Sequence, residues 1–288
     1  MIYILLPIHN RRIITLNFVN CLLNQTYKDY KLILIDDGST DNTSTEVLLK
    51  IPETIVIKGN GNWWWAGALQ KGYEYLQQIK VKDEDIALLI NDDTTFDEDF
   101  LKNGVNLMNG KIKTLVKSLS IDIETNQFCD GYIFADLNHL KFHEITNVNK
   151  ANCASTRGLF LNINEFFEIG GFYPKKLPHY LSDYEFTIRA FKKGFKIITD
   201  NRLFLYADFK TTGIQNIQSF TSRNYLKNLF TNSNAGNPIH WINFILLASD
   251  NKFQKVKNII RVILWTFKNF FVSIKTSIIS RVFKENNS

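Results

Sequence analysis

The sequence predicts an α/β protein whose central, mostly parallel sheet is flanked by helices. In the first hundred residues, short apolar runs alternate with helical patterns, as they do in βαβ units. Two of these runs end in paired carboxylates, Asp36-Asp37 and Asp92-Asp93, and open α/β sheets bind ligands at the carboxyl ends of their strands. A length of 288 residues is enough to bury one large core, with or without an appendage.

The expected elements follow in chain order from the period of the apolar residues. Beyond residue 100 the pattern is less regular, although the pair Gly170-Gly171 supplies the left-handed turn that ends a short helix, and Gly194 ends a longer one. The expected strands lie near residues 2–6, 31–35, 54–57, 86–90, 114–119, 132–134 and 159–163, and the expected helices near residues 13–24, 42–50, 66–79, 164–168 and 181–193.

Basic residues are concentrated near the carboxyl terminus. Residues 251–284 hold eight Lys or Arg and no acidic residue, which leaves 26 basic and 28 acidic residues elsewhere. Large apolar residues recur among them at helical spacing, without the run of about 18 that a spanning helix needs. The pattern favours a basic amphipathic helix on an anionic membrane surface. The alternative is a helix that packs on its own domain while its lysines are solvated. Nucleic-acid binding is not expected, because the rest of the chain is slightly acidic.

Cysteine usage and the amino terminus indicate a cellular location. Cys21, Cys129 and Cys153 are widely spaced and odd in number, which favours free thiols in a reducing compartment. The apolar start of the chain reaches His9 and Arg11 too soon for a secretory signal. We therefore expect a cytoplasmic protein, peripheral on the inner face of the plasma membrane if the tail binds lipid.

Asp92 and Asp93 close the apolar run 86–90 and open a polar loop. Carboxylates are hard oxygen ligands that suit Mg²⁺ or Mn²⁺, and such a cation binds phosphate groups. The pair therefore indicates a metal-diphosphate site. The competing interpretation is that the two residues are ordinary turn formers after a strand.

Polar motifs follow the first two expected strands, namely Pro7-Ile8-His9-Asn10 and Asp36-Asp37-Gly38-Ser39-Thr40-Asp41. Together with Asp92-Asp93, they occur in an order that resembles the inverting glycosyltransferases of family 2. The resemblance covers roughly residues 2–230 and implies the GT-A fold. It also implies a domain over 1–230, with a nucleotide-binding half (1–100) and an acceptor half (101–230), followed by a basic helical tail over 231–288.

The resemblance assigns donor-binding roles. It implies that Pro7 and His9 line a uridine or thymidine pocket and that Asp37 accepts a hydrogen bond from the N3–H of the base, which cytosine lacks. Asp93 matches the metal ligand, and Asp92 matches a contact to ribose or phosphate. Asp36 is equally explained as a turn or helix-capping residue.

A loop with three consecutive tryptophans, Asn60 to Ala68, precedes an expected helix. It resembles the Gly/Ala-rich loop that family members place beside the nucleotide sugar, which makes Gly67 a donor-binding candidate. Small residues let the backbone approach a ligand, and a helix N-terminus favours an anionic diphosphate. For each tryptophan, packing in the core is the alternative.

Asp183 matches the family's general base, which removes the proton of the acceptor hydroxyl as it attacks. The alternative is that Asp183 only stabilises the helix N-terminus by interacting with the helix dipole.

No histidine lies in Leu203 to Asp208, where many relatives place a metal ligand. Asp208 could substitute for it, or water could complete the metal shell. Arg223 resembles a phosphate clamp, although a surface ion pair explains it equally well.

Together with the resemblance to family 2, these residues imply an inverting, metal-dependent transferase. It would move a sugar from a UDP- or dTDP-sugar to a glycan or lipid-linked acceptor of a bacterial surface polysaccharide. A single addition is expected, because no Gln-x-x-Arg-Trp motif follows Asp183. Two alternatives remain open: a nucleotidyltransferase on a similar sheet, and a non-catalytic scaffold at the membrane.

Overall fold

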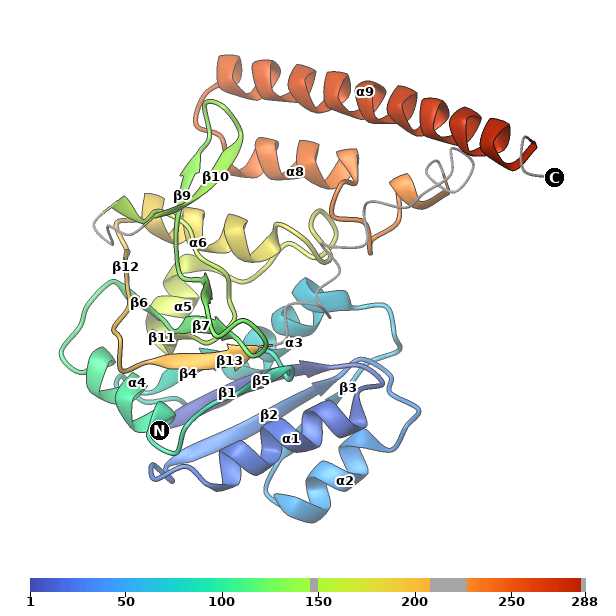
Figure 1. The fold of residues 1–288 in the computed structure, drawn as a ribbon. Helices are drawn as coiled ribbons and strands as arrows, with labels where there is room; N and C mark the ends of the chain where they lie inside the picture. The colour runs from blue at the N-terminus through green and yellow to red at the C-terminus, as the bar shows by residue number, and fades with distance from the viewer. Residues whose placement is uncertain (146–149, 208–226, 286–288) are drawn as a thin grey trace.

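The computed structural model describes residues 1–145, 150–207 and 227–285, with side chains described as far as residue 274. Its centre is a seven-stranded sheet of order β12-β6-β11-β4-β1-β2-β3, with helices on both faces (Figure 1). Strands β1, β2, β3 and β4 run parallel, whereas β11 is antiparallel to both of its neighbours. The predicted α/β class with a mostly parallel sheet is therefore confirmed.

The first half forms the predicted alternation of strands and helices. The parallel strands are buried along most of their length because helices cover both faces of the sheet. The elements are β1 (Ile2–Ile8), α1 (Arg12–Leu23), β2 (Tyr30–Asp36), α2 (Thr43–Lys50), β3 (Ile55–Lys58), α3 (Trp64–Gln78) and β4 (Ile86–Leu89).

One predicted strand, at residues 114–119, is wrong as a single element. The chain changes sheets at Ser118, whose N–H donates to the carbonyl of Gly158, while the next N–H, that of Leu119, donates to Leu203. The alternation of residues does not reveal this change, because both halves are buried. The split produces β6 (Thr114–Lys117) in the large sheet and β7 (Leu119–Asp122) in a small one.

The rest of the second half completes the large sheet and adds two small ones. The four-stranded sheet has the order β5-β13-β7-β8, and β9 pairs with β10 in a hairpin. The remaining elements of this half are β5 (Thr94–Thr95), α4 (Phe100–Met108), β8 (Phe128–Asp130), β9 (Tyr132–Asp136), β10 (Lys141–Ile145), β11 (Leu159–Asn162), α5 (Ile163–Ile169), α6 (Ser182–Lys192), β12 (Lys196–Ile198) and β13 (Phe204–Ala207).

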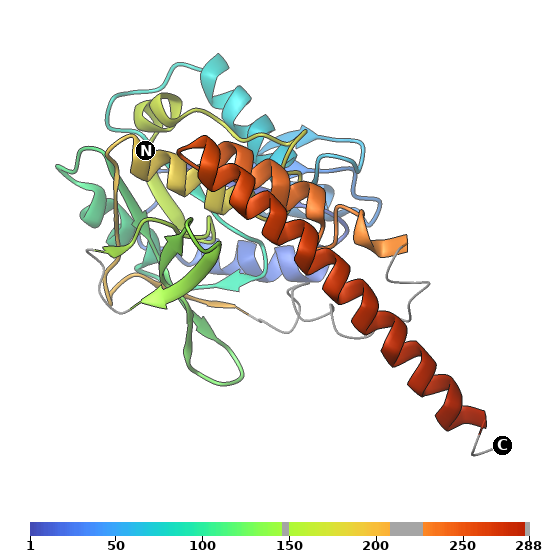
Figure 2. The same cartoon turned by 90° about the horizontal axis from the view of Figure 1, so that it is seen from above.

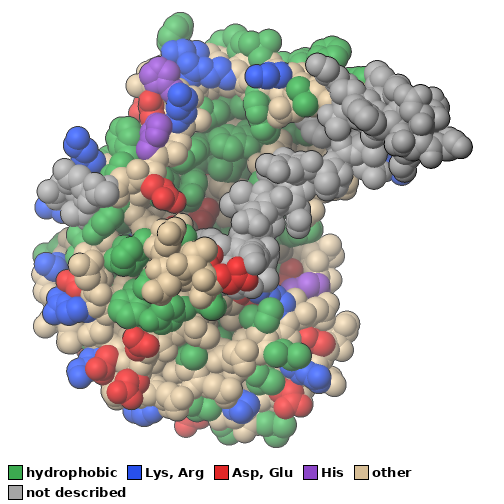
Figure 3. Space-filling model, viewed as in Figure 1, with side chains coloured by type: hydrophobic (Ala, Val, Ile, Leu, Met, Phe, Trp, Pro, Cys, Tyr) green, Lys and Arg blue, Asp and Glu red, His purple; other side chains and the backbone are tan. Residues whose placement is uncertain are grey.

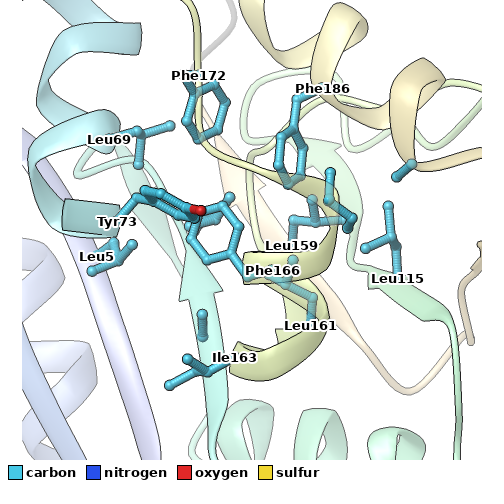
Figure 4. Close-up of a cluster of buried hydrophobic side chains, with 14 of the residues drawn as sticks. Leu5, Leu69, Tyr73, Leu115, Leu159, Leu161, Ile163, Phe166, Phe172 and Phe186 are labelled. Carbon is cyan, nitrogen blue, oxygen red and sulfur yellow. The ribbon is translucent and has the colours of Figure 1, made fainter. Parts of the chain in front are cut away.

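The main core lies on the two faces of the large sheet. On one face Leu5 packs with Leu69 and Tyr73 of α3 and with Phe166 of α5 (Figure 4). The other face packs mainly against α1, with Phe18 fully buried. Alternate residues of a strand point to opposite faces, so adjacent positions of β1 serve the two clusters. The helices thereby fix the sheet edge at which the strands end.

Two helices form a layer above α6. Helix α8 (Pro238–Ala248) buries Phe244 and Ala248 against Ile133 and Leu177. Helix α9 (Lys252–Glu285) runs across α8 and continues past the body of the molecule (Figures 1 and 2). The predicted tail helix is present, and α8 attaches it to the body. Among the described residues, no helix combines the length and hydropathy needed to cross a bilayer.

Helix α9 has a mixed inward face and an outward face rich in large apolar residues. On the inward face the amides of Gln254 and Asn258 are buried and donate to Asn138 Oδ1 (3.0 Å) and to the Leu137 carbonyl (2.7 Å), and Val262 is buried one turn further on. Hydrophobic and basic side chains stand side by side along this edge of the molecule (Figure 3). Most of its exposed apolar residues recur at three- and four-residue steps: Phe253, Val256, Ile260, Ile263, Leu264, Phe267 and Phe271.

Candidate active site

Asp92 and Asp93 lie in the loop that follows β4, where they form an ion-pair cluster with Arg11. The Arg11 guanidinium contacts Asp92 Oδ1 through Nη1 at 3.0 Å and Asp93 Oδ2 through Nη2 at 3.1 Å. Thr15 Oγ1 donates to the other oxygen of Asp92 at 2.9 Å. Burial raises the pKa of Asp92 to about 6, against the opposing effect of Arg11. Asp92 is therefore enclosed by protein partners on both of its oxygens.

Asp93 differs from its neighbour because one of its oxygens is unused. Asp93 Oδ1 is buried and has no hydrogen-bond partner among the described residues. An acceptor that loses water without gaining a donor is costly. A divalent cation would satisfy it. No group of three or more His, Cys, Asp or Glu side chains that could hold a metal occurs within the described part of the chain. The residues present therefore fit a cation held by one or two carboxylates and completed by substrate phosphate or water.

Asp37 organises the loop before α3. Its Oδ1 accepts from the N–H of Gly61 at 2.8 Å, and its Oδ2 accepts from those of Trp63 and Trp64 at 2.8 and 3.0 Å. A carboxylate offers about four acceptor positions, and these bonds use three of them. The loop approaches very closely here: a Cβ on Gly38, whose φ is +75°, would stand 2.7 Å from the Gly61 nitrogen.

Pro7 and His9 lie at the carboxyl end of β1, beside Asp36 and Asp37. The parallel register pairs Ile8 with Asp36. His9 is exposed, and its Nδ1 lies 2.6 Å from the Asp37 carbonyl, so this nitrogen carries the proton. The side chain of Asp36 accepts from the Ser39 N–H and from Ser44, as the turn interpretation predicts. The ends of β1, β2 and β4 thus bring Pro7, His9, Asp37, Asp92 and Asp93 to one edge.

The tryptophan loop meets the second half of the chain. Gly67 is buried, and a Cβ there would lie 3.1 Å from Trp63 Cβ and 3.6 Å from Pro174 Cβ. Trp65 packs on the core and its Nε1 donates to Thr156 Oγ1 at 3.2 Å. Trp63 also packs on the core, whereas the Trp64 side chain is 36% exposed. Core packing therefore explains two of the three indoles.

Asp183 occupies the first turn of α6, after Leu181 in a left-handed conformation. Its Oδ1 accepts from the Tyr184 N–H at 2.9 Å. Burial raises the pKa of the Asp183 carboxyl to about 6, and the negative charge of Asp130 adds to the rise. A carboxylate with this pKa is mostly ionised at neutral pH yet basic enough to accept a proton.

A buried lysine lies in the same neighbourhood. Lys117 is fully buried in β6, where it forms an ion pair with Asp130 (3.4 Å) and donates to the carbonyls of Ser118 and Arg157. Burial lowers the pKa of Lys117, whereas Asp130 and Asp183 oppose that change. Asp130 also accepts from Ser155. This network joins β6 to β8 and to the segment 155–157, and the charge of Asp130 acts on Asp183.

The half that carries Asp183 is tied directly to the tryptophan loop. The Ala66 N–H donates to the Pro178 carbonyl at 2.9 Å, and the Phe172 N–H donates to Gln70 Oε1 at 2.7 Å. The segment leading to α6 is therefore anchored on α3, whose preceding loop is anchored on Asp37.

Two predicted residues, Asp208 and Arg223, lie outside the described residues. In turn, the sequence interpretation missed Arg11, Thr15 and Lys117 as members of the site. Arg11 could have been found: it follows β1, the strand next to β4, so parallel topology places it at the edge that carries Asp92. Lys117 could not have been found in this way, because the sequence does not distinguish a lysine buried within a strand from a lysine exposed at the edge of a sheet.

The arrangement of strands and helices is the GT-A fold, as three solved structures show. The structure resembles the mannosyltransferase PcManGT from Pyrobaculum calidifontis, solved with GDP-Man and Mn²⁺, with a TM-score of 0.56 and 11% identity over 100% of this chain and 75% of that one. It resembles residues 1–349 of S. aureus TarS with UDP-GlcNAc (TM-score 0.57, 13% identity, 91% and 71% coverage). It also resembles GalNAc-T7 with UDP, GalNAc and Mn²⁺ (0.60, 12%, 98% and 58%).

The sequence itself matches Glycosyl transferase family 2 over residues 3–165, more than half of its length. The chain therefore belongs to this family. A comparison with curated protein sequences found no match. The similar structures include several with nucleotide sugars or nucleotides and two with Mn²⁺.

Proposed function

We propose that the protein is an inverting, metal-dependent glycosyltransferase that takes a sugar from a UDP- or dTDP-sugar. The acceptor is a glycan or lipid-linked intermediate of bacterial surface polysaccharide. Family membership supports the transfer of a glycosyl group.

The nucleotide binds at the edge formed by β1 and β2. Pro7 and His9 line the base, and the remaining acceptor position of Asp37 takes the N3–H of uracil or thymine. The three backbone N–H groups that hold Asp37 support this role, because they fix its carboxylate before the nucleotide arrives. Gly67 belongs to the helix start that faces the diphosphate.

Asp93 is the metal ligand, and its unpartnered buried Oδ1 supports this assignment. When bound, Mg²⁺ or Mn²⁺ stabilises the charge that grows on the departing diphosphate. Asp92 contacts ribose or phosphate once Arg11 releases it. Arg11 then remains near the diphosphate, where a guanidinium binds phosphate oxygens well. Asp208 and Arg223 are the candidates for a further metal ligand and a phosphate clamp.

Asp183 is the general base. It takes the proton of the acceptor hydroxyl while that oxygen attacks the anomeric carbon on the side opposite the nucleotide, which inverts the configuration. The observation that carries the proposal is the setting of this carboxylate: it lies in the first turn of α6, where burial raises its pKa to about 6.

The test uses nucleotide sugars and the Asp183→Asn variant. A thermal-shift screen of UDP- and dTDP-sugars with Mn²⁺ identifies the donor, since a ligand selective for the native state raises Tm. Asp183→Asn should abolish transfer and leave donor binding nearly intact, while Asp99→Asn, an exposed control, retains both. Turnover by Asp183→Asn at the wild-type rate contradicts the assignment. Release of pyrophosphate in place of a nucleoside diphosphate identifies a nucleotidyltransferase.

The acceptor is reached from the inner face of the plasma membrane, on which α9 lies. The outward apolar stripe of α9 supports this part, because it is flanked by basic residues: Lys252 and Lys257 in its first turns and Lys268 further on. An apolar face with Lys or Arg beside it is the composition of helices that lie in the plane of an anionic bilayer.

Vesicle co-sedimentation tests the membrane contact. Replacing Ile260, Leu264 and Phe267 by Ser removes the centre of the stripe and should abolish sedimentation with phosphatidylglycerol vesicles. Phe191→Ser is the matched control, because Phe191 is also an exposed aromatic residue but belongs to α6. Binding should weaken as salt rises. Equal sedimentation of the triple variant and the wild type would refute the contact.

A further inference from the structure

Trp64 is the exposed indole of the tryptophan loop, and its backbone is strained. Its φ is +57°, a left-handed conformation that is energetically unfavourable and that bulky residues rarely adopt. Asp37 holds this conformation by accepting the Trp64 N–H at 3.0 Å. A glycine would occupy the position without strain. A side chain retained at such a cost, and 36% exposed, calls for a role outside the core.

The Trp64 ring lies beside the segment that leads to Asp183. Its centroid is 5.8 Å from that of His179, and the His179 ring is in turn 4.4 Å from the ring of Tyr180. His179 Nδ1 is buried without a hydrogen-bond partner among the described residues. Burial lowers the pKa of His179 to about 4, so the imidazole is neutral at pH 7 and offers one donor and one acceptor nitrogen.

We propose that Trp64 and His179 form a binding subsite for the pyranose ring of the acceptor, with the ring stacked on the indole and a hydroxyl group bonded to His179. This inference rests on the proposed function. The C–H face of a sugar ring carries partial positive charge and packs on the negative face of an indole. The imidazole adds the directional contact that an apolar platform lacks.

The position of the subsite favours the acceptor over the donor sugar. The backbone N–H of Trp64 is hydrogen-bonded to Asp37, which belongs to the proposed nucleotide site. The Trp64 ring lies beside His179, which precedes the proposed base Asp183 by four residues. The acceptor must present a hydroxyl to Asp183. An aromatic face on the segment that precedes Asp183 can hold the rest of that sugar in place, which makes Trp64 a specificity-determining residue of the transfer.

The experiment is saturation-transfer NMR with methyl glycosides of glucose, galactose, mannose, rhamnose and N-acetylglucosamine. Each sample contains UDP or dTDP and a buffer with Mg²⁺ but without Mn²⁺. Wild-type protein should transfer saturation to at least one glycoside. Trp64→Gly should lose that signal without losing Tm, because glycine relieves the strain. Trp64→Phe should retain most of it, and His179→Ala should reduce it. Trp265→Ala, an exposed tryptophan on α9, should bind as the wild type does.

The nucleotide signals in the same samples separate the two levels of the proposal. If the nucleotide binds but no glycoside does, or if the glycoside signal survives in Trp64→Gly, the subsite is wrong and the glycosyltransferase assignment stands. If neither UDP nor dTDP binds, the proposed donor fails. A parallel titration with UDP- and dTDP-sugars gives the last outcome: if Trp64→Gly weakens binding of a nucleotide sugar more than binding of the bare nucleotide, the stacked ring belongs to the donor and the acceptor assignment is wrong.

Discussion

Arg11 neutralises Asp93 through an ion pair of 3.1 Å between Nη2 and Oδ2, while the other oxygen of Asp93 stays buried without a partner in the described residues. The same guanidinium neutralises Asp92. One cationic side chain thus stands where two adjacent carboxylates would otherwise repel each other. A divalent cation at Asp93 would make this neutralisation redundant, so Arg11 and the metal act on the same pair of charges.

This relationship predicts the behaviour of Arg11→Ala. Without metal, the variant should be less stable by about 1–3 kcal/mol, because Asp92 is left as an uncompensated buried charge, although the partial exposure of Arg11 limits the loss. Mn²⁺ should restore that stability. The measurement is Tm with and without Mn²⁺, and the metal-induced rise should be larger in Arg11→Ala than in the wild type. Lys102→Ala, which removes a surface ion pair, is the control. An equal rise in all three proteins would contradict the prediction.

The pKa of Asp183 predicts a pH profile. A general base works only when ionised, and burial raises the pKa of Asp183 to about 6. Activity should therefore be at its plateau above about pH 7 and fall about tenfold per pH unit well below pH 6. The initial rate at saturating donor, measured from pH 5 to pH 8, checks this. A profile that stays flat down to pH 5 would show that Asp183 does not titrate as the base.

The same pKa predicts that Asp183 lowers stability at neutral pH. Its folded-state pKa lies above the unfolded value of about 3.9, so folding favours the protonated form and opposes the ionised one. Asp183→Asn should therefore stabilise the fold by up to about 3 kcal/mol at pH 7.5, and the gain should fade as pH falls from 6 to 4. Urea unfolding at pH 7.5 and pH 4.5 measures both values. The prediction fails if the variant is less stable than the wild type at pH 7.5.

The sequence predicts the first half of the fold well because period and topology agree there. Ile2–Ile8 and Tyr30–Asp36 are apolar runs bounded by polar turns, and both are buried strands of the sheet. The parallel pairing of β1 with β2 and with β4 brings Asp37 and Asp93 to one edge. The change of sheets at Ser118 could not be predicted, since it depends on hydrogen bonds to Gly158 and Leu203, which are distant in sequence.

The site divides in the same way. Positions that follow strands, such as Asp93, can be placed by topology. Partnerships that depend on side-chain packing cannot: the bond between Trp65 and Thr156, the burial of Lys117 and the strained backbone of Trp64 all arise from residues far apart in the chain. The buried amides of Gln254 and Asn258 on α9 belong with them, because helical periodicity identifies an amphipathic helix without saying which face is covered.

A pair of glycines tests whether the shape of the Asp37 loop controls nucleotide binding. Gly38 and Gly110 both adopt left-handed φ values, +75° and +66°, but a Cβ at Gly38 would stand 2.7 Å from the Gly61 nitrogen whereas one at Gly110 meets no atom within 4 Å. Gly110→Ala should therefore lose only about 1 kcal/mol of stability, through backbone strain, and leave nucleotide binding unchanged.

Gly38→Ala must also displace Gly61, whose N–H donates to Asp37. It should lose more stability than Gly110→Ala and weaken UDP or dTDP binding by about tenfold or more, a loss of about 1.4 kcal/mol. Urea unfolding and calorimetric titration with the nucleotide measure the two effects. Equal nucleotide affinities in the two variants would mean that the close approach of the loops does not shape the nucleotide pocket.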